Sequence, residues 1–417
     1  MERLTKASPS AQMTEREREN REVAYQAACE GMVLLKNDGA LPLDVTRTAL
    51  YGPGASRTVK GGTGSGEVNE RRAVTILEGL EALGFEITTR PWLADFEADY
   101  AAKREAWLAE KRRRAQLLRP GFILDLLDTS FQPPCGRPIT EEDVAHSATD
   151  QCIYVLSRQS GEGRDRRPEK GDLLLSDEEE AAIRFCAAHY RRFLLVINTG
   201  GPMDMSFTDR IAGINAILYL CQLGSEGGRS FADVVSGRVS PSGRLADTWA
   251  RRYDDLPFAR DYGGLNGELK NEFYREGIYV GYRFFDSFCV EPAFPFGFGL
   301  SYTDFSIRCQ GISLSEDGRR ASVRAEVANT GPVHSGKEVV QLYVSAPGGE
   351  LDKEYQSLAA FAKTETLAPG ARQEVELSFD LANLASFRER DAAFVLEPGD
   401  YVLRLGSSSR TTVPVGA

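Results

Sequence analysis

The chain has 417 residues, of which 42% are hydrophobic and 27% charged, a composition typical of globular proteins with two or three domains. Fifty Lys and Arg against 61 Asp and Glu give a net charge of -11, which excludes electrostatic recruitment to nucleic acid or anionic membranes. The charged N-terminus lacks a signal-like apolar core, and no run of about 18 apolar residues could span a bilayer, so we expect a cytoplasmic protein.

Cysteine and histidine usage argues against a metal site. The seven cysteines are widely spaced and form no CxxC pair, so we expect reduced core residues in a reducing compartment. The three histidines, His146, His189 and His334, are far apart in the sequence. We therefore expect neither a metal nor a cofactor.

The first part of the chain alternates helical and strand patterns. Thr14 and Glu17 form a capping-box pattern that predicts a helix, and residues 1–20 are assigned to an N-terminal extension. A short strand is expected at 48–51, a helix at 73–84, and a helical insertion at 93–145.

From Cys152 the alternation becomes regular. Strands are expected at 152–157, 193–198 and 214–220, with a helix at 177–191 capped by Ser176 and Glu179. This order predicts an α/β sandwich with a mostly parallel sheet over residues 21–303, in which ligands gather beyond the carboxyl ends of the strands. Four unusual loops should line that edge: residues 52–54 with the glycine-rich run after them, 160–166, 199–202 and 222–228.

After residue 303 the pattern changes to period two. About seven short strands separated by Gly and Pro turns are expected between 304 and 417, with clear examples at 321–327, 339–344, 374–379 and 401–405. This pattern predicts a second domain, an immunoglobulin-like β-sandwich of the fibronectin type III kind.

The segment Ser160-Gly161-Glu162-Gly163-Arg164-Asp165-Arg166 is the most informative candidate site. It follows the apolar run 152–157 and sets one carboxylate between glycines, which let the backbone approach a bound molecule. This arrangement favours an acid/base role for Glu162. The alternative is a solvated loop whose charges pair with each other, and such pairs contribute only about 0–1 kcal/mol.

Other polar and aromatic groups admit a functional and a structural interpretation. The run 60–66 could cradle an anion, but no Gly-Lys-Ser/Thr opens a helix there, so a flexible loop that contacts a polyol or another domain is favoured. Glu226 is expected to cap the following helix, and the basic run 111–114 to form a solvated helix face. The aromatic side chains between 274 and 288 could stack on sugars, although such clusters more often pack in a core.

The order of several motifs resembles the non-barrel part of glycoside hydrolase family 3, the β-glucosidase family. The matching blocks are 30–43, 60–69, 161–166, 198–200, 224–233 with 240–245, 276–283 and 295–302. Residues 327–331 and 336–344 resemble the fibronectin type III-like domain of the same family.

The resemblance implies a retaining hydrolase of β-linked glucosides or oligosaccharides. Its glutamate acid/base comes from the α/β sandwich and its aspartate nucleophile from a TIM barrel, and Glu162 falls where the glutamate is expected. Asp165 and Arg166 would order the loop, and Lys60, Thr63 and Ser65 would contact the substrate. The sequence contains neither the nucleophile segment nor an eight-fold βα array, so we expect a TIM-barrel domain or subunit as partner and no activity without it.

Two other functions stay open at this point. A noncatalytic carbohydrate-binding or protein-interaction module would use the sheet edge and the aromatic segment without Glu162. A nucleotide-dependent α/β enzyme would instead bind phosphate at residues 60–66, and this alternative ranks last.

Overall fold

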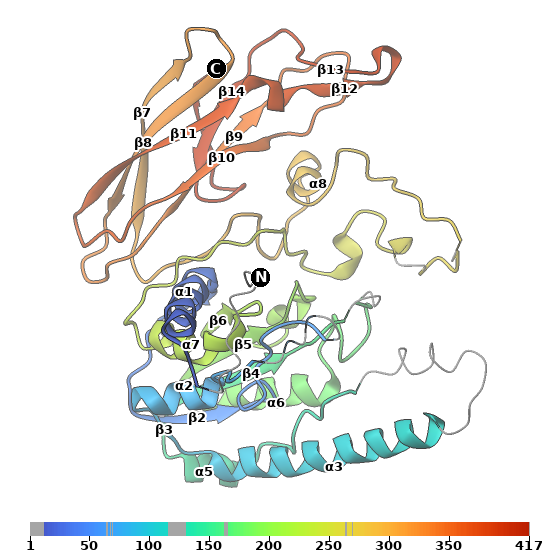
Figure 1. The fold of residues 1–417 in the computed structure, drawn as a ribbon, viewed down its shortest axis with the longest axis vertical. Helices are drawn as coiled ribbons and strands as arrows, with labels where there is room; N and C mark the ends of the chain where they lie inside the picture. Colours follow the sequence, from blue (N-terminus) through green and yellow to red (C-terminus); the bar gives the residue numbers. More distant parts are fainter. Residues whose placement is uncertain are drawn as a thin grey trace, which may run out of the picture.

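A six-stranded sheet forms the centre of the first domain, and a β-sandwich follows it (Figure 1). The computed structural model describes residues 12–63, 66, 68, 70–115, 131–161, 166–262, 265–268 and 270–416. The strand order is β1-β6-β5-β4-β2-β3. The strands are β1 Val33–Asn37, β2 Arg47–Tyr51, β3 Glu86–Ile87, β4 Gln151–Ser157, β5 Arg192–Asn198 and β6 Ala216–Tyr219.

The sheet is mostly parallel, as the sequence predicts. Strands β3, β2, β4, β5 and β6 pair in parallel, and β1 pairs with β6 in the antiparallel direction at one edge. Every residue of β4 except its last is buried, which matches the unbroken apolar run expected of a strand covered on both faces. The antiparallel β1 was not predicted.

Helices cover the sheet on both sides. They are α1 Glu15–Gly31, α2 Ile76–Leu83, α3 Arg90–Ala115, α5 Glu141–Ser147, α6 Asp177–His189 and α7 Gly227–Val235. Helix α8, Tyr282–Ser287, lies instead beside the β-sandwich (Figure 1). Helices α1, α2 and α7 pack together at the left of Figure 1, and α6 packs against β4 and β5. The capping boxes at Thr14 and Ser176 are present as predicted. The basic run on α3 is a solvated face, where Arg113 and Arg114 pair with Glu110.

Helices α2 and α7 cross at two glycines. A Cβ on Gly79 would lie 2.0 Å from the carbonyl oxygen of Gly228, and one on Gly228 would lie 1.9 Å from that of Thr75. Both distances are far below contact, so only glycine permits this approach. The crossing fixes the start of α7, directly after the loop that leaves β6.

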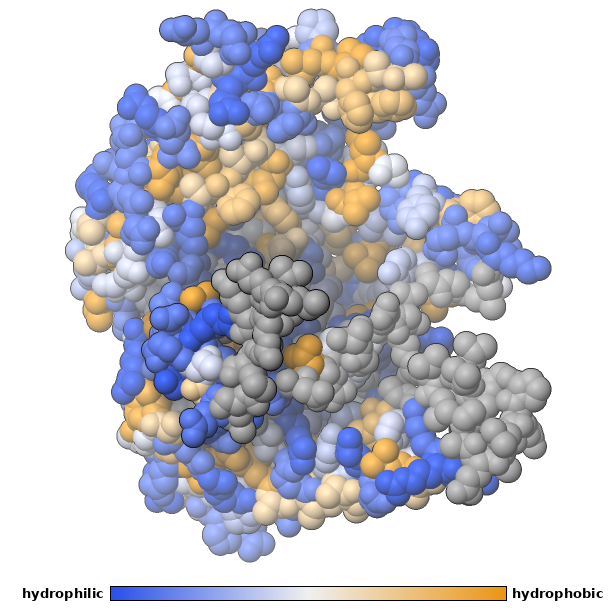
Figure 2. Space-filling view, viewed as in Figure 1, coloured by the Kyte–Doolittle hydropathy of each residue, from blue (hydrophilic) through white to orange (hydrophobic). Residues whose placement is uncertain are grey.

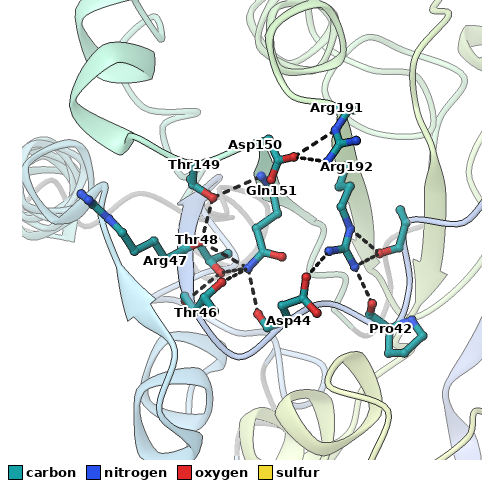
Figure 3. Close-up of polar contacts among 11 residues, drawn as sticks. Pro42, Asp44, Thr46, Arg47, Thr48, Thr149, Asp150, Gln151, Arg191 and Arg192 are labelled. Carbon is teal, nitrogen blue, oxygen red and sulfur yellow. Dashed lines mark hydrogen bonds and ion pairs between the residues drawn. The ribbon is translucent and has the colours of Figure 1, made fainter.

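The amino edge of the sheet is closed by two polar side chains (Figure 3). Gln151 is buried, and its amide Nε2 donates to Thr48 Oγ1 at 2.7 Å and to the Asp44 carbonyl at 2.9 Å. Arg192 donates to the Asp44 carboxylate at 2.6 Å and to the Pro42 carbonyl at 2.5 Å. These contacts hold the starts of β2, β4 and β5 together.

The second domain is an antiparallel β-sandwich. One sheet contains β7 Phe305–Leu314, β8 Arg320–Asn329 and β11 Arg372–Asp380, and the other contains β9 Val339–Ser345, β10 Ser357–Lys363, β14 Val402–Gly406 and β15 Val413–Gly416. The hairpin of β12 Ser386–Arg388 and β13 Ala393–Val395 projects beside them (Figure 1). Inward-facing apolar residues of both sheets form one core, as period-two patterning requires.

Ion pairs join the two domains. Glu30, near the end of α1, pairs with Lys337 at 2.7 Å and Lys363 at 2.8 Å. Arg244 and Glu338, both nearly inaccessible to solvent, pair at 2.5 Å. The sandwich is therefore attached to the α/β domain through buried and half-buried charges.

Candidate active site

The loops that follow the parallel strands meet at the carboxyl edge of the sheet, as the sequence predicts. Asn198, the fully buried last residue of β5, organises them. Its Nδ2 donates to the carbonyls of Val59 at 3.0 Å and Cys221 at 2.9 Å, and its Oδ1 accepts from Val59 N at 2.7 Å. One amide thus joins the loops after β2, β5 and β6.

The run that begins at Lys60 lies against the loop after β4. Thr63 N donates to the Ser160 carbonyl at 3.0 Å, and Thr63 forms a bridge with Gly161. A Cβ on Gly161 would lie 2.2 Å from Thr63 Oγ1, so a larger residue at this position would have to displace the Thr63 side chain. The contact fixes the described start of the loop that carries Glu162.

Of the three residues predicted to bind substrate, Lys60 and Thr63 are described and Ser65 lies outside the described residues. The Lys60 ammonium pairs with Glu70 and donates to the Val68 carbonyl at 3.2 Å. The hydrogen bond from Lys60 lowers the pKa of Glu70. In this structure the Lys60 charge is therefore engaged within its own loop.

Arg166 anchors the other end of the Glu162 loop. Its Nε donates to the Asp172 carboxylate at 2.8 Å, and its two terminal nitrogens donate to the carbonyls of Pro202 and Asp172, both at 2.8 Å. The Arg166 side chain is 18% exposed, so these bonds are mostly shielded from water. Glu162 and Asp165, the predicted acid/base and its neighbour, lie outside the described residues.

Asp172 and Arg158 complete this anchor, and sequence reasoning missed both. Arg158 Nε donates to the Asp172 carbonyl at 3.0 Å, and its terminal nitrogens bind the buried Glu179 carboxylate at 2.5 Å each. Glu179 Oε2 also accepts from the backbone N of Ser176 at the start of α6 at 2.8 Å. The sequence signal that could have indicated this anchor is Arg158, a charged residue directly after a buried strand.

The predicted capping role of Glu226 is wrong. Glu226 is buried, and its carboxylate pairs with Arg21 of α1, with no side-chain hydrogen bond to the first turn of α7. The Gly228 N–H that such a cap could bind donates to the Val74 carbonyl at 3.0 Å. The carboxylate binds the Arg21 guanidinium of α1 because a charge-assisted hydrogen bond is stronger than a hydrogen bond to a backbone N–H.

Comparison with known families identifies both parts of the chain. Residues 32–282 match the C-terminal domain of glycosyl hydrolase family 3, and residues 338–409 match the fibronectin type III-like domain. The chain belongs to glycosyl hydrolase family 3.

Relatives in family 3 cover nearly the whole chain. β-Glucosidase A of Butyrivibrio fibrisolvens is 33% identical over 94% of this chain and 50% of its own length. Two solved structures are similar: a β-glucosidase from Paenibacillus barengoltzii (TM-score 0.81, 33% identity, 95% of this chain, 42% of that one), and β-glucosidase 3B from Thermotoga neapolitana in complex with glucose (TM-score 0.78, 36% identity, 96% and 54%). The chain spans about half the length of these family 3 relatives.

Two open hollows lie elsewhere on this family 3 chain. One of about 330 Å³ lies among residues 254–261, and another of about 310 Å³ lies between α1 and the start of α7. Neither is lined by Lys60, Thr63 or Arg166. Within the described ranges, no helix has the length and apolar character needed to cross a membrane.

Proposed function

We propose that this family 3 chain supplies Glu162 as the general acid/base of a retaining β-glucosidase-type hydrolase of O-glycosidic bonds. One observation carries the proposal: the residues on both sides of 162–165 are held on the carboxyl edge of the sheet, Gly161 by Thr63 and Arg166 by Asp172. Ligands of parallel α/β sheets bind at this edge.

Retaining hydrolysis needs two carboxyl groups about 5–5.5 Å apart. In the first step a carboxylate nucleophile attacks the anomeric carbon while protonated Glu162 transfers its proton to the departing oxygen. In the second step Glu162 removes a proton from the water that hydrolyses the glycosyl-enzyme. Positioned acid/base catalysis contributes about 10²- to 10⁴-fold.

The nucleophile must come from outside this chain in the proposal. The relatives are about twice as long as the segment they share with it, and we assign the aspartate nucleophile to a TIM-barrel domain or subunit in that remainder. A β-linked glucoside or oligosaccharide would bind between the two parts.

Arg166 acts as a positioning residue in this proposal. A free guanidinium near Glu162 would stabilise the carboxylate and weaken it as an acid. Because Arg166 is committed to the Asp172 carboxylate and two carbonyls, its charge is largely compensated. Asp165 is assigned to ordering the same loop, and Lys60, Thr63 and Ser65 to contacting substrate hydroxyls.

The test uses this chain mixed with the complementary half of the Butyrivibrio enzyme, meaning the half that this chain does not match. Hydrolysis is measured for aryl β-glucosides with good and poor leaving groups. We expect Glu162→Gln to lower kcat/KM, which reports on the first step, by about 10²- to 10⁴-fold with a poor leaving group and much less with a good one, because only the poor leaving group needs the proton.

Glu169→Gln is the matched control, since Glu169 is an exposed glutamate close to Glu162 in the sequence and has no assigned role. We expect it to keep wild-type activity. Hydrolysis of equal rate by Glu162→Gln and wild type on the poor leaving group would refute the assignment. Full hydrolysis by the isolated chain would refute the proposal that the nucleophile comes from outside this chain.

A further inference from the structure

Arginines gather around one of the two open hollows, the hollow of about 310 Å³ between α1 and the start of α7. Hydrophilic side chains dominate this part of the surface, left of centre in Figure 2, where α1 and α7 lie in Figure 1. The charged residues that line the hollow are four arginines and two glutamates: Arg18, Arg21 and Glu22 of α1, Arg72, Glu226, and Arg229 of α7. The hollow therefore has an excess of positive charge in a chain whose net charge is -11.

Two of the arginines are held in place by neighbouring side chains. Arg21 pairs with the buried carboxylate of Glu226. Arg229 donates to Glu22 at 2.8 Å, and its guanidinium lies over the Tyr25 ring, 3.8 Å from the ring centroid. Planar guanidiniums that are fixed in this way lose little conformational freedom when they bind a further anion.

The other two arginines are weakly compensated. Arg18 pairs with Glu15 at 3.0 Å, but the two side chains are 55% and 73% exposed, so water screens most of this attraction. Arg72 is exposed, and its side chain makes no ion pair or hydrogen bond with any residue that the structure describes. The four arginines exceed the two glutamates by two charges, and Arg18 and Arg72 supply this excess.

A phosphate group fits this excess of charge. A phosphate monoester carries about -1.5 to -2 charges at pH 7 and offers three oxygens that accept strong hydrogen bonds. Guanidiniums match these oxygens with pairs of N–H donors, whereas a carboxylate ligand would neutralise only one of the two charges. A volume of about 310 Å³ is at the lower end for ligand sites, so the hollow suits a small phosphorylated molecule.

The hollow is joined to the loop that is predicted to contact substrate. The Lys60 carbonyl accepts a hydrogen bond from Gly224 N at 3.1 Å. The Ser225 carbonyl accepts one from Val74 N at 2.8 Å, and the residue after Ser225 lines the hollow. The wall of the hollow therefore binds both ends of the segment that runs from Lys60 to Val74 and contains one of the four arginines.

We propose that this hollow is an anion site that binds the phosphate group of a small molecule through Arg18, Arg21, Arg72 and Arg229. The bound phosphate links Arg72 to α1 and α7, and so stabilises the segment that begins at Lys60. Neither Thr63 nor Arg166 lines the hollow, so the inference does not depend on the proposed hydrolase function.

Titration calorimetry of the full chain tests the site with three compounds at constant ionic strength: inorganic phosphate, glucose 6-phosphate and glucose. We expect both phosphates to bind with one-to-one stoichiometry and an excess of glucose to leave this binding unchanged. The affinity should fall as NaCl is added, because salt screens exposed charges. Tighter binding of glucose 6-phosphate than of inorganic phosphate would assign the site to phosphate monoesters, and equal affinity would assign it to inorganic phosphate.

Arg72→Gln and Arg229→Gln should each weaken phosphate binding by at least about tenfold, since each removes charge-assisted hydrogen bonds. Loss of the Arg72 side chain breaks no described contact, so the Tm of Arg72→Gln without phosphate should equal that of wild type. Arg191→Gln is the matched control, because it removes the same charge from an 81% exposed side chain at the amino edge of the sheet. It should bind phosphate like wild type.

The inference is overturned if wild type does not bind phosphate, or if Arg72→Gln and Arg229→Gln bind it with unchanged affinity. Equal weakening by Arg191→Gln would also overturn it, because binding would then report only the overall charge. Displacement of phosphate by glucose would show that the hollow recognises a sugar instead. Hydrogen exchange tests the link to the loop: phosphate should slow exchange of the Val74 and Gly224 amides, and unchanged exchange would contradict that link.

Discussion

The two edges of the six-stranded sheet are built from the same strands but use polar side chains differently. At the amino edge, Gln151 and Arg192 bind backbone and side-chain groups that belong to the sheet itself, which closes it (Figure 3). At the carboxyl edge, Asn198 likewise binds backbone carbonyls next to the strand ends, but glycine-containing loops extend beyond these bonds. Arg166 and Thr63 hold the ends of one such loop.

The comparison separates side chains that stabilise the fold from side chains that position the candidate catalytic loop. Buried amides and guanidiniums that satisfy backbone carbonyls contribute to stability at both edges. Only at the carboxyl edge do such bonds lie on both sides of a candidate catalytic residue, at Gly161 and Arg166. Substitutions at the amino edge should therefore change stability alone, and those at the carboxyl edge should change activity.

Among the residues that the structure describes, the largest expected effect belongs to Arg166. We expect Arg166→Met to lower kcat/KM by about 10²-fold in the reconstituted enzyme, because the loop loses three anchoring bonds and small misplacements of catalytic groups are that costly. Steady-state kinetics test this. Arg167→Met, at the exposed neighbouring position, should leave kcat/KM unchanged, and an equal loss there would mean that charge rather than anchoring matters.

At the amino edge we expect the opposite result. Gln151→Leu should lower the free energy of unfolding by about 1–3 kcal/mol, since it leaves the Thr48 hydroxyl and the Asp44 carbonyl without their buried donor. Urea denaturation measures the loss. A large fall in kcat/KM at temperatures where the variant is folded would contradict the division between the edges.

The contact between Gly161 and Thr63 offers a finer test at the carboxyl edge. Gly161→Ala should lower kcat/KM about tenfold, because its Cβ would overlap Thr63 Oγ1 and displace the loop. Thr63→Ala removes the overlapping atom together with a proposed substrate contact, so the double variant should be no slower than Thr63→Ala alone. If the losses in kcat/KM from the two substitutions add in the double variant, overlap with the Thr63 hydroxyl is not the cause of the Gly161→Ala defect.

The smallest expected effect involves Glu30, which belongs to neither edge. Burial raises the pKa of Glu30, but hydrogen bonds from Lys337 and Lys363 outweigh it and lower the pKa below 4.5. A carboxyl with a lowered folded pKa stabilises the protein above its unfolded value and loses that contribution as pH falls.

Thermal unfolding of Glu30→Gln tests this linkage. The difference in Tm from wild type should be largest above pH 4.5 and should shrink as the pH falls through the lowered pKa. A difference that is constant with pH would show that the two lysine pairs contribute no net charge interaction.

The sequence predicted the parallel sheet and its loop edge because the strands are unbroken apolar runs and the helices begin at local capping boxes. These signals are contained within a few residues. The antiparallel pairing of β1 with β6 and the Arg21–Glu226 pair depend on contacts between distant segments. Single-sequence periodicity contains no information about them.

In the candidate site, too, local features were predicted from the sequence and contacts between separate segments were not. Glu162, Arg166 and Lys60 were proposed from local composition, and Thr63 was proposed from the same glycine-rich run as Lys60. The Asp172 partner of Arg166 and the bond from Arg158 were not predicted, because five residues separate Arg166 from Asp172 and nothing in the sequence specifies how they fold back. Side-chain pairing across a loop requires coordinates.

The most direct test of the central claim is azide rescue of Glu162→Gln in the reconstituted enzyme, measured with an aryl β-glucoside that has a good leaving group. Azide attacks the glycosyl-enzyme without a general base, so the account predicts that added azide accelerates turnover of Glu162→Gln and yields a β-glycosyl azide, with no acceleration of wild type or Glu169→Gln. Turnover of Glu162→Gln that is unchanged by azide, with no azide adduct, would contradict the assignment of Glu162 as the acid/base.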